Sequence, residues 1–136
     1  MKYSTIIDTG TYSDKILLTV GTTWEELNAF TKDFHRNKKN IILDKDLFNG
    51  TCDGFFDHNT NVLWLSQWKG SVYDQDVLRH ECHHVVQILL GNRRGMHEEL
   101  EALAYQQDYL IKKIRDILNK ERREVKCNVP AVVLKK

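Results

Sequence analysis

Residues 73–105 read YDQDVLRHECHHVVQILLGNRRGMHEELEALAY, and this stretch decides the fold prediction. Apolar residues recur at helical spacing up to Gly91, and a second apolar stripe runs from about His97 to about Lys120. The glycines and arginines at 91–95 interrupt the pattern and are typical of a helix end followed by a turn. The stretch therefore predicts two long antiparallel helices joined by a short turn.

The residues before this stretch predict short strands around one helix. Segments 3–8 and 15–20 are rich in β-branched residues and predict a hairpin, and a second hairpin is expected within 51–68. Thr22 or Thr23 is the expected N-cap of the helix between them. Strands followed by a helical pair predict an α+β fold. We expect a small, mostly antiparallel sheet, an N-terminal helix, a central helix and a long antiparallel C-terminal helix.

The chain has 136 residues, of which 41% are apolar and 29% charged, so one globular domain is expected. We place this domain at residues 1–126, with a further strand at 40–43. Residues 127–136 are expected to be a C-terminal tail, and the end of the chain from Val125 to Lys136 is expected to be a short strand or disordered. No apolar run approaches the ~18 residues of a membrane span, and no secretory signal opens the chain. Three widely spaced cysteines fit reduced thiols, so a cytoplasmic protein is predicted.

Charge is uneven along the chain. Residues 112–136 hold nine Lys and Arg against three Asp and Glu, whereas the remainder holds 11 against 16. A basic end can bind nucleic acid, but this run lacks interleaved aromatic residues for base stacking. We therefore interpret it as a solvated helix end, and nucleic acid is not the expected partner.

Residues 80–84, His-Glu-Cys-His-His, match the pattern H-E-x-x-H inside the first long helix. His84 lies about 40° around the helix axis from His80 and one turn along, so both imidazoles can share one tetrahedral metal ion. Glu81 flanks the pair, where its carboxylate can reach a water on the metal without being a ligand. The spacing predicts a metal site at the margin of the buried face.

A metal ion needs a third protein ligand, and the second long helix offers candidates. Glu101 lies six residues after Gly95, and His84 lies seven residues before Gly91. On two antiparallel helices joined by the turn at 91–95, these two residues are therefore at nearly the same distance from the turn. Glu101 is therefore the preferred third ligand, and Glu98 or His97 is the alternative. A His/His/Glu set favours zinc.

The pattern H-E-x-x-H at 80–84, followed by E-x-x-A-Y at 101–105, resembles that of the gluzincin-type zincin metallopeptidases. It is most similar to small phage- or prophage-encoded zincin-like proteins, and more distantly to ImmA/IrrE-like peptidases. The resemblance covers residues 50–110. It implies a zinc-dependent peptidase that acts on a protein or peptide. The alternative is a catalytically silent, metal-stabilised interaction module of phage or mobile-element origin.

The resemblance also implies a mechanism. Zinc held by His80, His84 and Glu101 would activate a water for attack on the peptide carbonyl. Glu81 would take the proton as general base and pass it to the leaving amine. A further donor should stabilise the oxyanion. The candidates for this role are Tyr105, Tyr73 and His97.

By the same resemblance, the hairpin before the motif supplies an edge strand above the metal. Residues 61–66 would then border the substrate cleft. The larger related families carry Asp or Asn where Tyr105 stands here, so the second helix departs from their pattern at that position. The residues expected to line the cleft are Asn61, Leu63 and Trp64.

Overall fold

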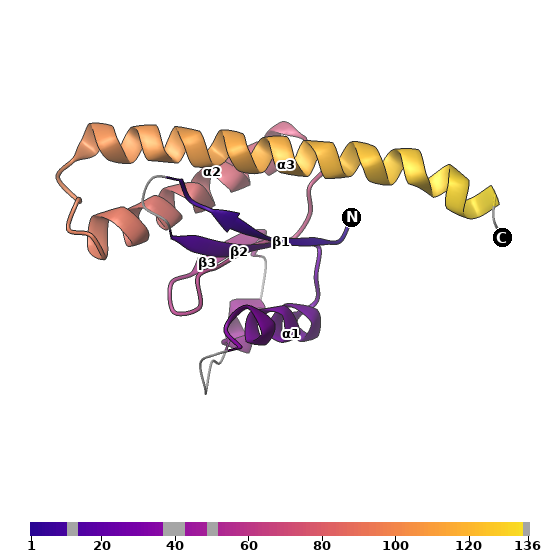
Figure 1. The fold of residues 1–136 in the computed structure, drawn as a ribbon, viewed down its shortest axis with the longest axis horizontal. Helices are drawn as coiled ribbons and strands as arrows, with labels where there is room; N and C mark the ends of the chain where they lie inside the picture. Colours follow the sequence, from indigo (N-terminus) through magenta and orange to yellow (C-terminus); the bar gives the residue numbers. More distant parts are fainter. Residues whose placement is uncertain (11–13, 37–42, 49–51, 135–136) are drawn as a thin grey trace.

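The computed structural model describes residues 1–10, 14–36, 43–48 and 52–134, with side chains described as far as Val125. The fold is α+β, as predicted, with a four-stranded sheet and three α-helices (Figure 1). In chain order the elements are β1 (Tyr3–Asp8), β2 (Lys15–Val20), α1 (Trp24–Phe34), the 3-10 turn η1 (Lys45–Phe48), β3 (Gly54–Asp57), β4 (Val62–Leu65), α2 (Val72–Val86), its π-helical continuation η2 (Gln87–Asn92) and α3 (Leu100–Leu134).

The sheet has the order β1-β2-β4-β3. Both predicted hairpins are confirmed, because β1 pairs antiparallel with β2 and β3 pairs antiparallel with β4. A parallel pairing between β2 and β4 joins the hairpins, in register from Leu17 opposite Val62 to Val20 opposite Leu65. As a result β4 is an interior strand, and β3 is the edge strand on its side of the sheet.

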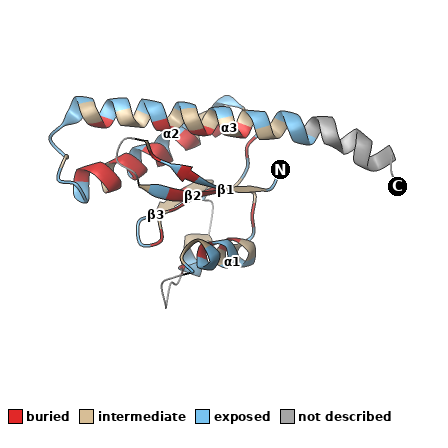
Figure 2. Ribbon diagram, viewed as in Figure 1, coloured by how far each residue is buried: buried red, intermediate tan, exposed pale blue. Residues whose placement is uncertain are grey.

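The sheet is the middle layer of three. Helices α2 and α3 cover one face and α1 lies on the other (Figure 1), and the buried residues of the helices face inward (Figure 2). Two groups of buried apolar side chains correspond to the two faces. Leu63 and Leu78 belong to the core under α2 and α3, whereas Leu27 and Trp64 belong to the core under α1.

Polar caps fix where the helices begin. Thr23 is the N-cap of α1, and its capping box with Glu26 confirms one of the two expected caps. Ser71 caps α2 by accepting from the Asp74 N–H over 3.1 Å. The buried Asp74 carboxylate accepts from the Lys69 N–H at 2.6 Å and from the Gln67 side chain at 3.1 Å. These bonds fix the connection from β4 into α2.

The connection between α2 and α3 differs from the prediction. The first helix does not end at Gly91 but continues through the π-helical segment to Asn92. The turn that follows is held by a bond from the Met96 N–H to the Leu90 carbonyl over 2.9 Å, and α3 begins only at Leu100. Leu100 falls within the predicted apolar stripe, but it is 71% exposed at the first position of α3 and is not part of the core.

Helix α3 is longer than predicted. It continues to Leu134, so the short strand expected as one alternative at the end of the chain is wrong for residues 125–134, which are helical. Lys, Glu and Arg at 120–124 are good helix formers, and no glycine follows them to end the helix. The strand expected at 40–43 falls, apart from Leu43, outside the described residues. Within the described residues, no helix has the length and apolar character needed to cross a membrane.

Candidate metal centre

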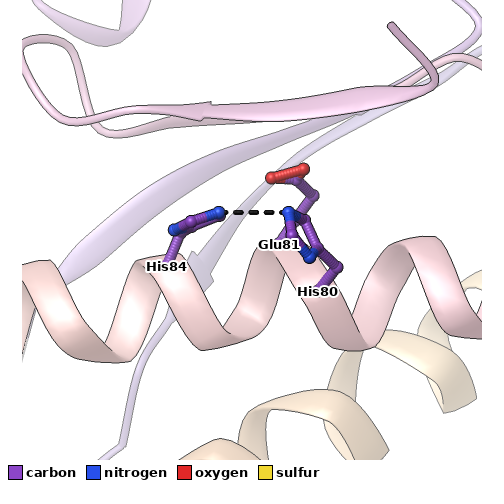
Figure 3. A group of neighbouring side chains, drawn as sticks. All are labelled: His80, Glu81 and His84. Atoms are coloured by element: carbon purple, nitrogen blue, oxygen red, sulfur yellow. Dashed lines mark hydrogen bonds between the residues drawn. The ribbon is translucent and has the colours of Figure 1, made fainter.

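The histidines of the H-E-x-x-H motif face one another on the exposed margin of α2. The Nε2 atoms of His80 and His84 lie 3.1 Å apart (Figure 3). Two nitrogens bound at about 2.0–2.1 Å to one tetrahedral ion lie roughly 3.3 Å apart. The two Nε2 atoms are therefore almost as far apart as they would be when bound to one ion. The helix would not need to rearrange for them to bind it.

Glu81 completes a compact group with the two histidines. The ligand atoms of the three residues all lie within 4.8 Å of one another. Figure 3 shows the Glu81 carboxylate on the side of α2 that faces the β3–β4 hairpin. The side chain is 5% exposed and accepts no hydrogen bond from the described part of the chain. Burial raises the pKa of Glu81, and the nearby charge of His80 opposes this only in part.

The surroundings of His84 favour the form that binds metals. Burial lowers the pKa of His84, and the charges of His80 and His83 lower it further. A lower pKa keeps the imidazole neutral at neutral pH, and neutral imidazole is the metal-binding form. His83 itself points elsewhere, since its Nδ1 lies 3.2 Å from the side-chain oxygen of Gln107 on α3.

A hollow of about 380 Å³ lies beside the motif, between α2 and the start of β3. Gly54 makes this approach of helix and strand possible, because a Cβ there would lie 3.1 Å from Val77 Cγ1 and 3.1 Å from the Trp64 carbonyl oxygen. The residues that line the hollow are Cys52, Asp53, Gly54, Asp76, Val77, His80 and Glu81. The motif therefore opens onto a space large enough for a peptide side chain.

The edge strand β3 presents main-chain groups beside this hollow. The Ser66 N–H donates to the Asp53 carbonyl over 2.9 Å, so Asp53 is a hydrogen-bonded partner of β4. Because this pattern alternates in antiparallel pairs, the N–H and C=O groups of Gly54 and Phe56 point outward from the sheet. The Cys52 thiol donates to the Gly54 carbonyl over 2.7 Å. Among the described residues, no strand pairs with the other outward groups, so an added strand could do so.

The structure does not bring Glu101 to the histidines. Glu101 is exposed in the first turn of α3 and is not a member of the group formed by His80, Glu81 and His84. The prediction from distances to the turn fails because the second helix starts at Leu100 rather than at about His97, which leaves Glu101 in its first turn. In addition, α3 contacts α2 at His83, whose Nδ1 lies 3.2 Å from the Gln107 side-chain oxygen, whereas the Glu81 carboxylate lies on the side of α2 that faces the strands (Figure 3).

Among the alternatives on the same side of the turn, His97 and Glu98 are exposed and also lie outside the group. His97 Nδ1 lies 3.4 Å from the Gly91 carbonyl oxygen, so this ring is held at the end of η2. Tyr105 is 71% exposed on α3 and does not line the hollow. None of the three oxyanion candidates lines the hollow, but the Tyr73 hydroxyl donates to the carboxylate of Asp53, which does line it.

The residues expected to line the cleft lie elsewhere. Leu63 is fully buried beneath α2, and Trp64 is 7% exposed in the core on the α1 face of the sheet. Asn61 lies in the turn before β4, where its side chain donates to the Lys15 carbonyl. The physical reason is that β4 pairs on both sides, so the edge above α2 is β3 rather than β4.

Sequence reasoning missed the residues that do line the hollow. Cys52 and Asp53 precede a short strand and match no motif, and only the fold brings them to the motif helix. Gly54 carried a usable signal, because a glycine at the start of an apolar strand often marks a close approach of another element. Comparison of the chain with protein families, curated proteins and solved structures finds no match.

Proposed function

We propose that the chain is a zinc-dependent metallopeptidase-like protein that hydrolyses peptide bonds. The observation that supports this most strongly is the separation of 3.1 Å between the Nε2 atoms of His80 and His84, with a buried carboxylate beside them. The two imidazoles would hold the ion. When bound, zinc would supply a Lewis acid that lowers the pKa of water and polarises a carbonyl.

Glu81 is the proposed general base. Its carboxylate is buried, lacks a hydrogen-bond donor among the described residues and has a raised pKa, so it holds a proton more readily than an exposed glutamate. It would take the proton of the attacking water and deliver it to the leaving amine. The Tyr73 hydroxyl is bonded to Asp53 at the wall of the hollow, so Tyr73 is the preferred oxyanion donor in place of Tyr105. It would exchange its bond to Asp53 for one to the oxyanion.

The proposed substrate is a protein or peptide in extended form. An extended peptide could pair with the Gly54 N–H and with the outward N–H and C=O of Phe56, as an added strand does at the edge of a sheet. A carbonyl of that peptide would then lie over the α2 margin that carries the motif. The hollow would accept a neighbouring side chain.

A catalytically silent, metal-stabilised interaction module is the second candidate. The small number of potential ligands favours this candidate. Among the described residues, Glu81 is the one further group whose ligand atom lies within 4.8 Å of those of the histidines. Such a protein would bind a partner through the same edge strand without cleaving it.

The substitution Glu81→Gln separates the two candidates, with Glu99→Gln at an exposed position as the matched control. Zinc content and cleavage of an unfolded casein substrate would be measured for each protein. We expect Glu81→Gln to keep its zinc and lose cleavage by about 10²-fold or more, and the control to behave as wild type. Cleavage that survives in Glu81→Gln refutes the base. Loss of zinc in that variant makes Glu81 a ligand instead.

A further inference from the structure

A second hollow, of about 370 Å³, lies far along α3 from the turn, where this helix passes the connection from β4 to α2 and the N-terminal residue (Figure 1). It shares no residue with the hollow beside the histidines. The residues that line it are Met1, Trp68, Lys69, Arg122 and Val125. Two are cationic, and none of these lining residues is acidic.

Arg122 lines this hollow and has no anionic partner among the described residues. Its Nε is buried and has no acceptor in the described part of the chain. The guanidinium lies against the loop, since a Cβ at Gly70 would lie 3.2 Å from Nη2. Gly70 has a φ of +77°, which favours glycine and lets the backbone pass beneath the guanidinium. A buried donor that has lost water without gaining an acceptor is costly, so an anion that accepts from Nε would be bound favourably.

The other wall of the hollow is apolar and fixed. Trp68 is 3% exposed, and its indole N–H donates to the Asn119 side chain over 2.9 Å. This bond uses the one polar atom of the indole, so the rest of the ring offers an apolar surface. Val125 continues that surface on α3. Lys69 adds a second positive charge from the loop.

We propose that this hollow binds a carboxylate that carries an apolar chain. The guanidinium of Arg122 matches the two oxygens of a carboxylate, and Lys69 adds a point charge. The volume greatly exceeds that of a carboxylate alone, and the exposed apolar side chains of Met1 and Val125, beside the edge of Trp68, suit hydrocarbon. A free carboxylic acid and the C-terminus of an apolar peptide share this chemistry.

Isothermal titration calorimetry of the full chain tests the proposal. The probes are octanoate, acetate, 1-octanol, and an N-acetylated trileucine with a free or an amidated C-terminus. The variants are Arg122→Gln and Lys69→Gln, with Arg123→Gln as the control, because Arg123 is the exposed neighbour on the same helix. Circular dichroism checks that each variant is folded.

We expect wild type and Arg123→Gln to bind octanoate or the free-acid peptide equally well. Arg122→Gln should weaken this binding by about tenfold or more, because a charge-assisted hydrogen bond is lost. Lys69→Gln should weaken it less. Acetate and 1-octanol should bind more weakly than octanoate. If octanoate binds more tightly than the free-acid peptide, the ligand is a free carboxylic acid; if the peptide binds more tightly, it is a peptide C-terminus. The proposal is overturned if neither carboxylate probe binds wild type, or if the Arg122 and Arg123 variants bind equally well.

Discussion

Replacing Asp74 by alanine should loosen the start of the helix that carries the histidine pair. The Asp74 carboxylate is buried and accepts from the Lys69 N–H at 2.6 Å and from the Gln67 side chain at 3.1 Å. Hydrogen bonds to a charged group contribute about 1.5–3 kcal/mol each, and the Gln67 amide can turn toward water once its acceptor is gone. We therefore expect Asp74→Ala to lower the free energy of unfolding by about 3 kcal/mol at pH 7.

This effect should depend on pH in a defined direction. Burial alone would raise the pKa of Asp74, but the hydrogen bonds from Lys69, Gln67 and Ser71 outweigh it and lower the pKa below its ordinary value of 3.8. The unfolded chain then binds the proton more readily than the folded one. The stabilisation is complete above the unfolded pKa and is lost as the pH falls through the folded pKa.

Urea unfolding at pH 7 and at several values below pH 4 measures both effects. The matched control is Asp76→Ala, because Asp76 is exposed and pairs with Arg79 on the same helix over 2.8 Å. An exposed pair of this kind contributes about 0.5 kcal/mol or less. The difference between wild type and Asp74→Ala should shrink as the pH falls. A loss no larger than that of the control, or one that is constant with pH, refutes the reasoning.

Three further predictions concern packing. Gly54→Val should lower both the melting temperature and the zinc affinity, because its Cβ would crowd Val77 and force α2 away from β3; thermal unfolding and zinc titration measure this. In the folded protein Cys82 should resist iodoacetamide, since burial strongly raises its pKa, whereas the exposed Cys52 should react; peptide mapping by mass spectrometry distinguishes them. Leu118→Ala, at a fully buried position, should cost about 2–5 kcal/mol in urea unfolding.

The local features of the fold could be predicted from the sequence. The two hairpins, the cap at Thr23 and the helical placement of residues 80–84 all depend on neighbouring residues, so periodicity and turn chemistry were sufficient. The compact group of His80, Glu81 and His84 has the same origin, because spacing along one helix determines it.

The features that depend on distant residues could not be predicted. The parallel pairing of β2 with β4 joins segments far apart in the chain, and it turned the expected edge strand into an interior one. The position of Glu101 depended on where two helices end and begin. The first helix ends in a π-helical segment, and α3 begins at Leu100. Glu101 is therefore closer to the start of α3 than the sequence pattern indicated. Helix ends are predicted less reliably than helix interiors. A prediction that compares distances from the turn between two helices therefore carries the same error.

The central claim is that His80 and His84 share one metal ion on the β3 side of α2. The most direct test is the zinc content of the protein, purified without chelator or nickel and supplied with zinc, measured by mass spectrometry for wild type, His84→Ala and Glu101→Ala. The account predicts about one zinc per chain in wild type, its loss in His84→Ala and its retention in Glu101→Ala. A wild-type protein that binds no zinc, or equal loss in both variants, would contradict it.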